Sequence, residues 1–299
     1  MKSSEPTNND IRVEHILFPT DFSPAADAAF AYALAIAERY HAKLHVAHVI
    51  NVEPSGPIDS ECSPAIIKQA HERTAQKIHH LLRMRPLAAD ACETIVAEGV
   101  ISEVLPDLLR RNHIDLVIVG THGRRALKKL LFGSMAEEIL RLAQCPVLTV
   151  GPKSASAPPN LELRHILYLL KFEPDASEAA KYAVSLAQRF GADLTVMNVC
   201  ENVPLSAAQQ EKQEGITEPF KFWAEEHVPK GSTLHNQVHF ERGFGPAMEA
   251  ILNFIPKAGA DLVVMSVERV DPIIAAHLPV PDAAYQLITR APCPVLTVH

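Results

Sequence analysis

The chain has 299 residues, which predicts about two domains because a single hydrophobic core usually stops growing near that size. With 47% hydrophobic and 21% charged residues, its composition excludes a disordered or fibrous protein. The net charge of -7 argues against a broad basic face for nucleic acid, so we expect no nucleic acid partner.

The first residues, MKSSEPTNND, are polar where a signal peptide needs an apolar segment, and no apolar run approaches membrane-spanning length. We therefore expect a cytoplasmic protein with no membrane partner. The five cysteines are widely spaced and odd in number, which predicts reduced thiols. His41, His45 and His48 lack an accompanying cysteine or carboxylate in a ligand spacing, so we expect no metal site.

The first half of the chain alternates short apolar segments with longer helical ones. Residues 15–20 predict a buried strand, and Ser23 followed by Pro24 predicts the capped start of a helix that ends near Tyr40. The elements predicted after it are a strand at 43–49, a helix at 64–84, a strand at 93–99, a helix at 100–112, a strand at 115–120, a helix at 133–143 and a strand at 147–150.

An internal repeat organises the rest of the chain. The segment from His15 to Val49 aligns without a gap with the segment from His165 to Val199, and CPVLTV closes both halves. A stretch rich in proline, serine and alanine separates the repeats. We therefore predict a domain at 1–152, a linker at 153–164 and a second domain at 165–299.

Strands that alternate with helices imply right-handed parallel crossovers. The predicted fold class is α/β, with two tandem doubly wound domains, each built on a five-stranded, mostly parallel sheet flanked by helices. Ligands of such sheets settle beyond the carboxyl ends of the strands, where the strand order reverses. The residues that follow HILFPT, LHVAHV and DLVIV are therefore the candidates for a site.

A glycine-rich segment follows DLVIV. It contains Gly120, Gly123 and Gly133, and Ser134 opens the next helix. Glycines leave room for a ligand against the main chain, and a helix N-terminus offers unpaired N–H groups to an anion, so the segment predicts a phosphate cradle. A plain strand-to-helix turn is the alternative. Four basic residues between the second and third glycines would draw a polyphosphate inward, or belong to a solvated loop.

These residues resemble the universal stress protein family, whose ATP-binding subgroup is marked by G-x2-G-x9-G-[S/T]. Gly120, Gly123, Gly133 and Ser134 match that pattern position by position. PTDFS, the HV ending of the second strand, VAEG, DLVIVGTHGR and CPVLTV extend the resemblance over essentially the whole first half. The resemblance implies a fold like that of the adenine nucleotide alpha hydrolases and ATP or a related adenine nucleotide as ligand, with or without Mg²⁺.

The resemblance also implies a role for each site residue. Asp21 would lie beside the ribose or adenine end, although a turn-capping role is the alternative. The main chain around Pro19 and Val49 would line the adenine slot. The residues expected to flank the nucleotide or hold its phosphates are Val119, Gly120, Gly123, Gly133, Ser134 and Met135.

The second half departs from this pattern. Lys171 stands where the first half has Asp21, and Ser266 stands where it has Gly120. The other replacements are Glu173 for Ser23, Arg269 for Gly123, Pro281 for Gly133 and Asp282 for Ser134. Side chains would fill the phosphate space and Asp282 would repel phosphate, so we expect no ATP there by the same mode.

Three functions follow as hypotheses. The first is a stress-response regulatory protein of the universal stress type that binds an adenine nucleotide in its N-terminal domain. The second is a slow ATPase, although the chain has no Walker A lysine motif and no nucleophile paired with a base, so we expect no catalytic residue and an enzyme is not favoured. The third is a nucleotide-independent interaction module with unidentified protein partners.

The repeated CPVLTV bears on assembly. These closing strands predict sheet edges, and an exposed edge invites pairing. Single-domain relatives commonly dimerise through that strand, so the resemblance implies that Val147–Val150 and Val295–Val298 pair within this chain as an internal pseudo-dimer. Association of two whole chains into a homodimer is left open.

Overall fold

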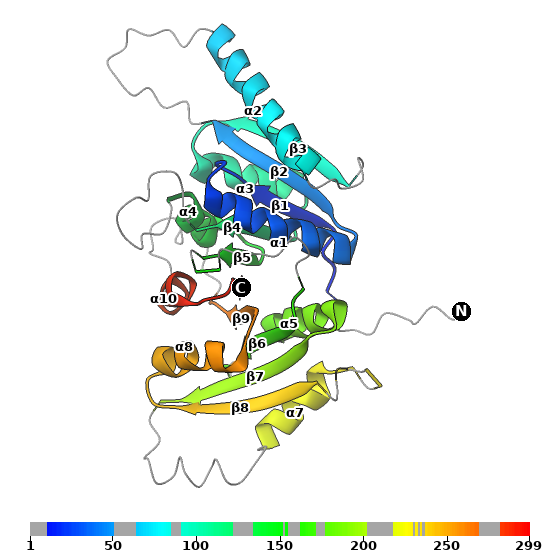
Figure 1. Ribbon diagram of the computed structural model, residues 1–299, viewed down its shortest axis with the longest axis vertical. Coiled ribbons are helices and arrows are strands. Elements are labelled where there is room, and N and C mark those ends of the chain that lie inside the picture. Colours follow the sequence, from blue (N-terminus) through cyan, green and yellow to red (C-terminus); the bar gives the residue numbers. More distant parts are fainter. Residues whose placement is uncertain are drawn as a thin grey trace, which may run out of the picture.

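The computed structural model describes residues 11–50, 64–84, 91–121, 134–151, 153–154, 162–171, 177–201, 218–229, 231–232, 234, 237–268 and 282–299. Across these residues the chain forms a single twisted ten-stranded sheet with helices on both faces (Figure 1). The two halves of the sequence occupy the two ends of this sheet.

The first half contains five strands and four helices in the described residues. In chain order they are β1 (His15–Pro19), α1 (Pro24–Tyr40), β2 (Lys43–Ile50), α2 (Pro64–Met84), β3 (Cys92–Glu98), α3 (Ile101–Arg111), β4 (Leu116–Gly120), α4 (Ser134–Leu142) and β5 (Val147–Val150). The type of each of these elements and its place in the order are as predicted from the sequence.

The second half repeats this order of strands. Its described elements are β6 (His165–Leu169), α5 (Ser177–Phe190), β7 (Asp193–Cys200), α7 (Glu218–His227), β8 (Val238–Phe244), α8 (Ala247–Ala258), β9 (Leu262–Ser266), α10 (Asp282–Arg290) and β10 (Val295–Val298). The predicted α/β class with two tandem five-stranded units is therefore confirmed.

The strands lie in the order β3-β2-β1-β4-β5-β10-β9-β6-β7-β8. All pairs are parallel except the central one, in which β5 runs antiparallel to β10. Within the first half the chain winds outward from β1 through β2 to β3, then returns to β4 on the other side of β1. The strand order therefore reverses between β1 and β4, and in the second half between β6 and β9.

Two hydrophobic layers cover the two faces of the sheet. One layer contains side chains of α1, α2, α5 and α7, and the other contains side chains of α3, α4, α8 and α10. Neighbouring strand residues alternate between these layers, because successive side chains of a strand point to opposite faces. Phe18, for example, belongs to the first layer and Leu17 to the second.

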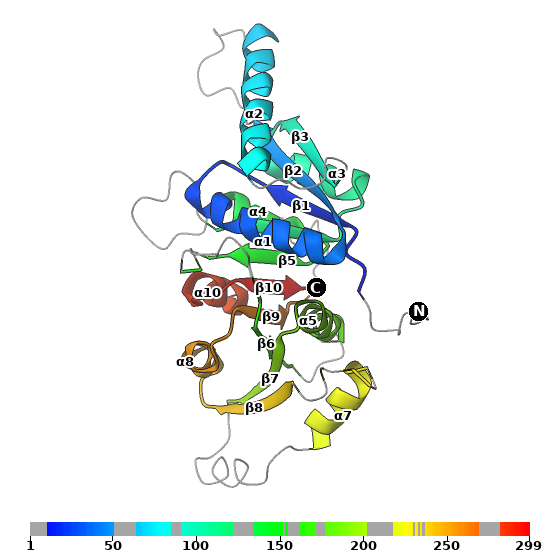
Figure 2. The same cartoon turned by 45° about the vertical axis from the view of Figure 1, so that its right-hand side comes forward.

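The central pair of strands joins the two halves (Figure 2). Leu148 lies opposite Leu296 in the antiparallel register, and both side chains are buried. Thr149 Oγ1 donates to Val295 O at 2.9 Å, and Thr297 Oγ1 donates to Val147 O at 3.2 Å. The two threonines thus make matching bonds across the pair, which we call the seam.

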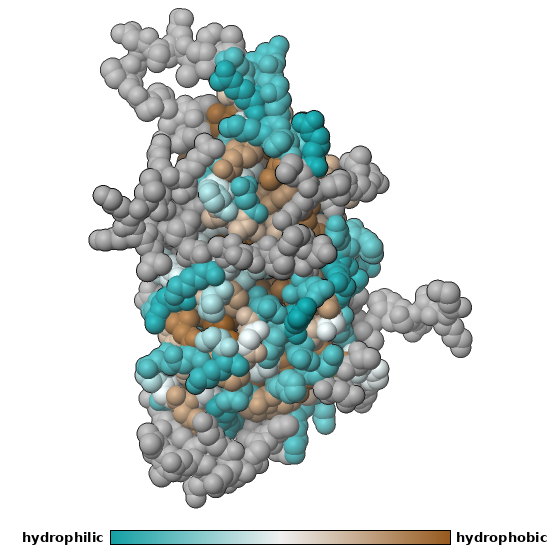
Figure 3. Space-filling model, in the orientation of Figure 1, coloured by the Kyte–Doolittle hydropathy of each residue, from teal (hydrophilic) through white to brown (hydrophobic). Residues whose placement is uncertain are grey.

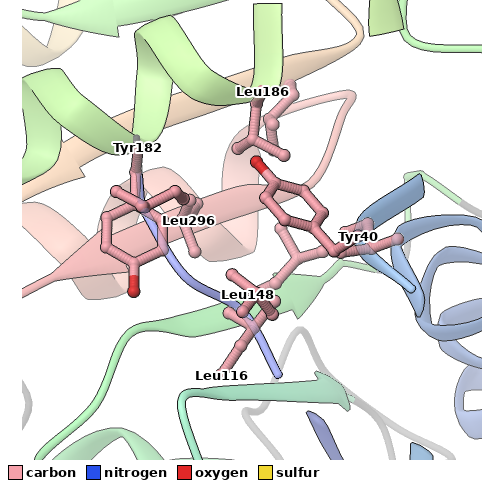
Figure 4. A pocket seen from close by; sticks show the side chains of 10 residues that line it. Tyr40, Leu116, Leu148, Tyr182, Leu186 and Leu296 are labelled. Carbon is pink, nitrogen blue, oxygen red and sulfur yellow. The ribbon is translucent and has the colours of Figure 1, made fainter. Parts of the chain in front are cut away.

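Helices α1 and α5 meet over the same face of the seam. The Arg39 guanidinium lies 5.1 Å from the Phe190 ring centroid, and the Arg189 guanidinium lies 4.9 Å from the Tyr40 ring centroid. The Tyr40 hydroxyl is 3.0 Å from Ser185 Oγ. Tyr40 lines a small apolar pocket with leucines from both halves (Figure 4). The halves are therefore held by helix packing as well as by strand pairing.

The outer surface varies between regions. Helix α2 extends beyond the sheet and carries mostly hydrophilic residues (Figures 1 and 3). Among the described residues, no helix is both long enough and apolar enough to cross a membrane. Four cysteines in this part of the chain are free thiols, and burial raises the pKa of Cys145 and of Cys293 to about 12. Cys62 lies outside the described residues.

Candidate functional site

The first candidate site lies at the carboxyl ends of β1 and β4, where the strand order reverses. We call it the first cleft, because ligands of doubly wound sheets bind in a crevice at this point. Pro19 ends β1, Val119 and Gly120 end β4, and Val49 lies one residue before the end of the neighbouring β2. Asp21 follows β1 directly. These five predicted site residues are therefore brought together at one edge of the sheet, as expected of a doubly wound fold.

The turn that carries Asp21 is held by its own side chains. Asp21 Oδ1 accepts from Ser23 N–H at 3.0 Å, and Thr20 Oγ1 accepts from Phe22 N–H at 3.0 Å. Ser23 Oγ accepts from Ala26 N–H at 3.2 Å and so caps α1. Asp21 is half-buried and keeps its second carboxylate oxygen beyond this turn bond. The geometry accommodates both expected roles of Asp21, in the turn and toward a ligand.

A second carboxylate lies in the first turn of α1. Burial raises the pKa of Asp27, and the negative charge of Asp21 raises it further. A group whose ionised form is disfavoured by a neighbouring anion marks a locally negative patch. This patch suits neutral hydroxyl donors, such as those of a ribose, better than it suits phosphate.

Gly120 is required by a close approach of main chains. A Cβ at this position would lie 2.4 Å from Ala25 O and 2.6 Å from the Ala25 carbonyl carbon. The end of β4 therefore touches the first turn of α1, and the adjoining Val119 is fully buried. Glycine at 120 serves the packing of the cleft wall, a reason that the sequence motif alone does not provide.

The remaining predicted site residues are only partly described. Ser134 begins α4, and Met135 is half-buried against the second hydrophobic layer. Gly123, Gly133 and the four basic residues between them lie outside the described residues. Their expected contact with phosphate therefore stays a prediction.

Three residues at the cleft were not predicted as site residues. Phe22 has a positive φ of 58°, which is uncommon outside glycine. Its ring lies 4.9 Å from the His48 ring and 5.2 Å from the Lys77 ammonium. The sequence contains no local signal for this cluster, because Phe22, His48 and Lys77 come from three separate elements.

The corresponding edge of the second half has different side chains. Lys171 is exposed, and Ser266 is buried where the first half has Gly120. Glu201 Oε1 accepts from Ala247 N–H at 3.0 Å, so a carboxylate already occupies the first turn of α8. Arg269 and Pro281 lie outside the described residues. The described part of this cleft therefore differs from the first in charge and in the side chain at the end of the strand.

The three histidines of HAKLHVAH do not gather at one place. His41 follows α1 in a left-handed conformation, and His48 lies at the carboxyl end of β2. His45 is buried at the opposite end of β2, where its Nε2 is 3.1 Å from His15 Nδ1 and its Nδ1 is 3.4 Å from Glu93 Oε2. No group of three potential metal ligands occurs among the described residues.

We expect His45 to make the protein less stable in mild acid. Burial lowers the pKa of His45 from 6.5, an effect strengthened by Lys43 and His15 and opposed by Glu93. Because the unfolded chain then takes up a proton before the native protein does, the free energy of unfolding falls as the pH drops below about 6.5. The pKa of Glu93 is lowered from 4.5, chiefly by a hydrogen bond from Lys43, so its own contribution is lost only in stronger acid.

Urea unfolding at about pH 7 and about pH 5.5 measures this effect. The matched variant is His45→Thr, because the second half has Thr195 at the equivalent position. There, Thr195 Oγ1 lies 2.7 Å from His165 Nε2. His45→Thr should reduce the loss of stability between the two pH values. An equal loss in the variant and the wild type would show that His45 is not its source.

The fold and the cleft define a tandem doubly wound α/β protein. The family model of the universal stress protein family matches residues 12–151 and again residues 162–299. A universal stress protein of Archaeoglobus fulgidus has the same fold, with a TM-score of 0.68 over 96% of this chain and 99% of that chain, at 19% identity.

Curated relatives agree with this match. A universal stress protein A homologue of Coxiella burnetii is 33% identical over 147 residues, covering 47% of this chain and 97% of its own. A universal stress protein of Mycobacterium tuberculosis is 25% identical over 230 residues, covering 72% of this chain and 77% of its own. The chain belongs to the universal stress protein family, with two family units in tandem.

Proposed function

We propose that the first domain, residues 1–152, binds ATP or a related adenine nucleotide, and that this occupancy regulates what the protein presents to a partner. The observation that supports the proposal is the convergence of Pro19, Asp21, Val49, Val119 and Gly120 at the switch point of the first half. The glycine motif that completes this site in sequence continues directly from β4.

The described residues fit the sugar and base end of such a ligand. Asp21 supplies a half-buried acceptor for ribose hydroxyls. Val49 supplies main-chain N–H and C=O groups that face the β1 side of β2, beyond the point where β1 has ended. The phosphates, alone or with Mg²⁺, would lie toward the N-terminus of α4, where helix N–H groups favour an anion.

The asymmetry of the two halves supports one such site per chain. Lys171 and Ser266 replace Asp21 and Gly120 in the second half, and Asp282 begins α10 where Ser134 begins α4. A carboxylate at a helix start satisfies the helix dipole and repels phosphate. We therefore assign no ATP to the second half, residues 165–299.

Calorimetric titration of the full chain with ATP tests the proposal. Saturable binding with about one site per chain is expected, and mass spectrometry of the denatured protein should release an adenine nucleotide that copurified with it. Absence of saturable binding at about millimolar ATP, where the binding free energy is only about −4 kcal/mol, would overturn the proposal.

Asp21→Ala should weaken ATP binding about tenfold, because it removes a charged acceptor whose hydrogen bonds are each worth about 1.5–3 kcal/mol. Asp21→Asn keeps an oxygen that can accept from Ser23 N–H and separates the loss of charge from the loss of the turn bond. Lys171→Ala at the equivalent exposed position of the second half is the matched control and should leave the affinity unchanged. If Asp21→Ala bound ATP as tightly as the wild type, Asp21 would act only in its turn and would not contact the ligand.

A further inference from the structure

The strand ladder between β1 and β2 stops at Ala47, three residues before the end of β2 at Ile50. Lys43 and Ala47 of β2 face β1, since Lys43 N–H donates to Glu14 O and Ala47 O accepts from Thr20 N–H, each at 2.8 Å. Residues at alternate positions face β3, since Leu44 N–H donates to Ala91 O at 2.8 Å and Ile50 O accepts from Gly99 N–H at 3.0 Å. Val49 is therefore the next residue of β2 whose N–H and C=O point toward β1.

In a continuing parallel ladder, Val49 N–H would donate to Thr20 O. None of the hydrogen bonds within the described residues joins these two groups. Instead, His48 Nδ1 lies 2.6 Å from Thr20 O. A carbonyl oxygen only accepts, so Nδ1 carries the proton and donates. The imidazole thus binds the carbonyl oxygen to which the N–H of the next residue, Val49, would donate in a continuing ladder.

The His48 ring is fixed in this position by its surroundings. It packs at 4.9 Å from the Phe22 ring, on which the Lys77 ammonium also lies. Phe22 N–H is itself turned away from Val49, because it donates to Thr20 Oγ1 at 3.0 Å. The two main-chain groups after β1 that would pair with Val49, Thr20 O and Phe22 N–H, are therefore each bonded to a side chain.

In the second half, a different side chain makes the equivalent bond to a main-chain carbonyl oxygen. Asn198, the equivalent of His48, donates from Nδ2 to Leu170 O at 3.0 Å, while Leu170 N–H donates to Met197 O at 2.8 Å. An asparagine can therefore make the bond that the histidine makes. This repetition provides a variant that preserves the bond without the imidazole.

We infer that His48 is a positioning residue of the first cleft, which binds Thr20 O and thereby leaves the main-chain edge of Val49 open to the base of the ligand. The inference rests on the proposed nucleotide function for its ligand. An open N–H and C=O pair matches adenine, which presents an amino donor and ring-nitrogen acceptors, whereas guanine presents a carbonyl acceptor in place of the amino group.

Amide hydrogen exchange of the nucleotide-free protein tests the positioning role directly. In His48→Ala, Thr20 O is released and Val49 N–H should donate to it, so exchange of the Val49 amide should slow about tenfold. His48→Asn should leave it as fast as in the wild type. His48→Leu lacks the donor but keeps an apolar body against Phe22, and serves if the alanine variant does not fold. Unchanged Val49 exchange in the donor-free variants would overturn the inference.

Titration with ATP and GTP completes the test. His48→Ala should weaken ATP binding about tenfold and reduce the preference for ATP over GTP, and His48→Asn should restore both to within about twofold of the wild type. Failure of His48→Asn to restore them would contradict the positioning role. If the wild type binds no nucleotide, the proposed function fails, and the exchange measurement still decides whether His48 keeps Val49 open.

Discussion

Replacing Gly120 by alanine should lower the free energy of unfolding by about 1–3 kcal/mol and abolish saturable ATP binding. The added Cβ would lie 2.4 Å from Ala25 O, a main-chain atom in the first turn of α1 that no side-chain rotation can move away. Relief requires β4 and α1 to separate, and this separation displaces the turn that carries Asp21. Urea unfolding and ATP calorimetry measure the two effects.

The second half offers the matched control. Ser266→Gly removes a side chain at the equivalent strand position and should cost no more than about 1 kcal/mol, with ATP binding unchanged. If the Gly120→Ala protein were as stable as the wild type, α1 and β4 could separate at this point at little cost in free energy. In that case the glycine would be required by the ligand alone.

Truncating the paired leucines of the seam should have an effect of similar size. Leu148→Ala and Leu296→Ala should each lower the free energy of unfolding by about 3 kcal/mol, because both side chains are buried where the two halves meet. The two losses should not add simply, since the residues are register partners. Chemical denaturation of both single variants and the double variant measures this coupling.

Thr149→Val is the control for the seam. It keeps the volume of the side chain and removes one hydrogen bond, from Thr149 Oγ1 to Val295 O. It should cost about 1 kcal/mol. If Leu296→Ala cost no more than Thr149→Val, the halves would be held chiefly by α1 and α5 and the seam would contribute little.

Much of the fold could be predicted because its signals are local and occur twice. Ser23 and Pro24 fix the start of α1, and the unbroken apolar runs in β4 and β9 are typical of strands covered on both faces. Because the segment that begins at His15 is repeated from His165, the same order of elements is predicted from both halves. The convergence of Asp21 with the end of β4 follows from the topology of such sheets.

The fine structure of the cleft could not be predicted, because it depends on contacts between distant elements. His48 bonds to Thr20 across 28 residues, and a strand pattern shows only which face its side chain takes. The positive φ of Phe22 has no sequence signal, since this conformation is mainly associated with glycine. The collision that excludes a side chain at Gly120 depends on how closely α1 lies against β4.

The seam also determines how this protein can assemble. Because β5 and β10 each have neighbours on both sides, the outer edges of the described sheet are β3 and β8. A further chain can lengthen this sheet only there, so the closing strands are no longer available for dimerisation between molecules. Any homodimer must therefore use a surface other than the one that already joins the two halves.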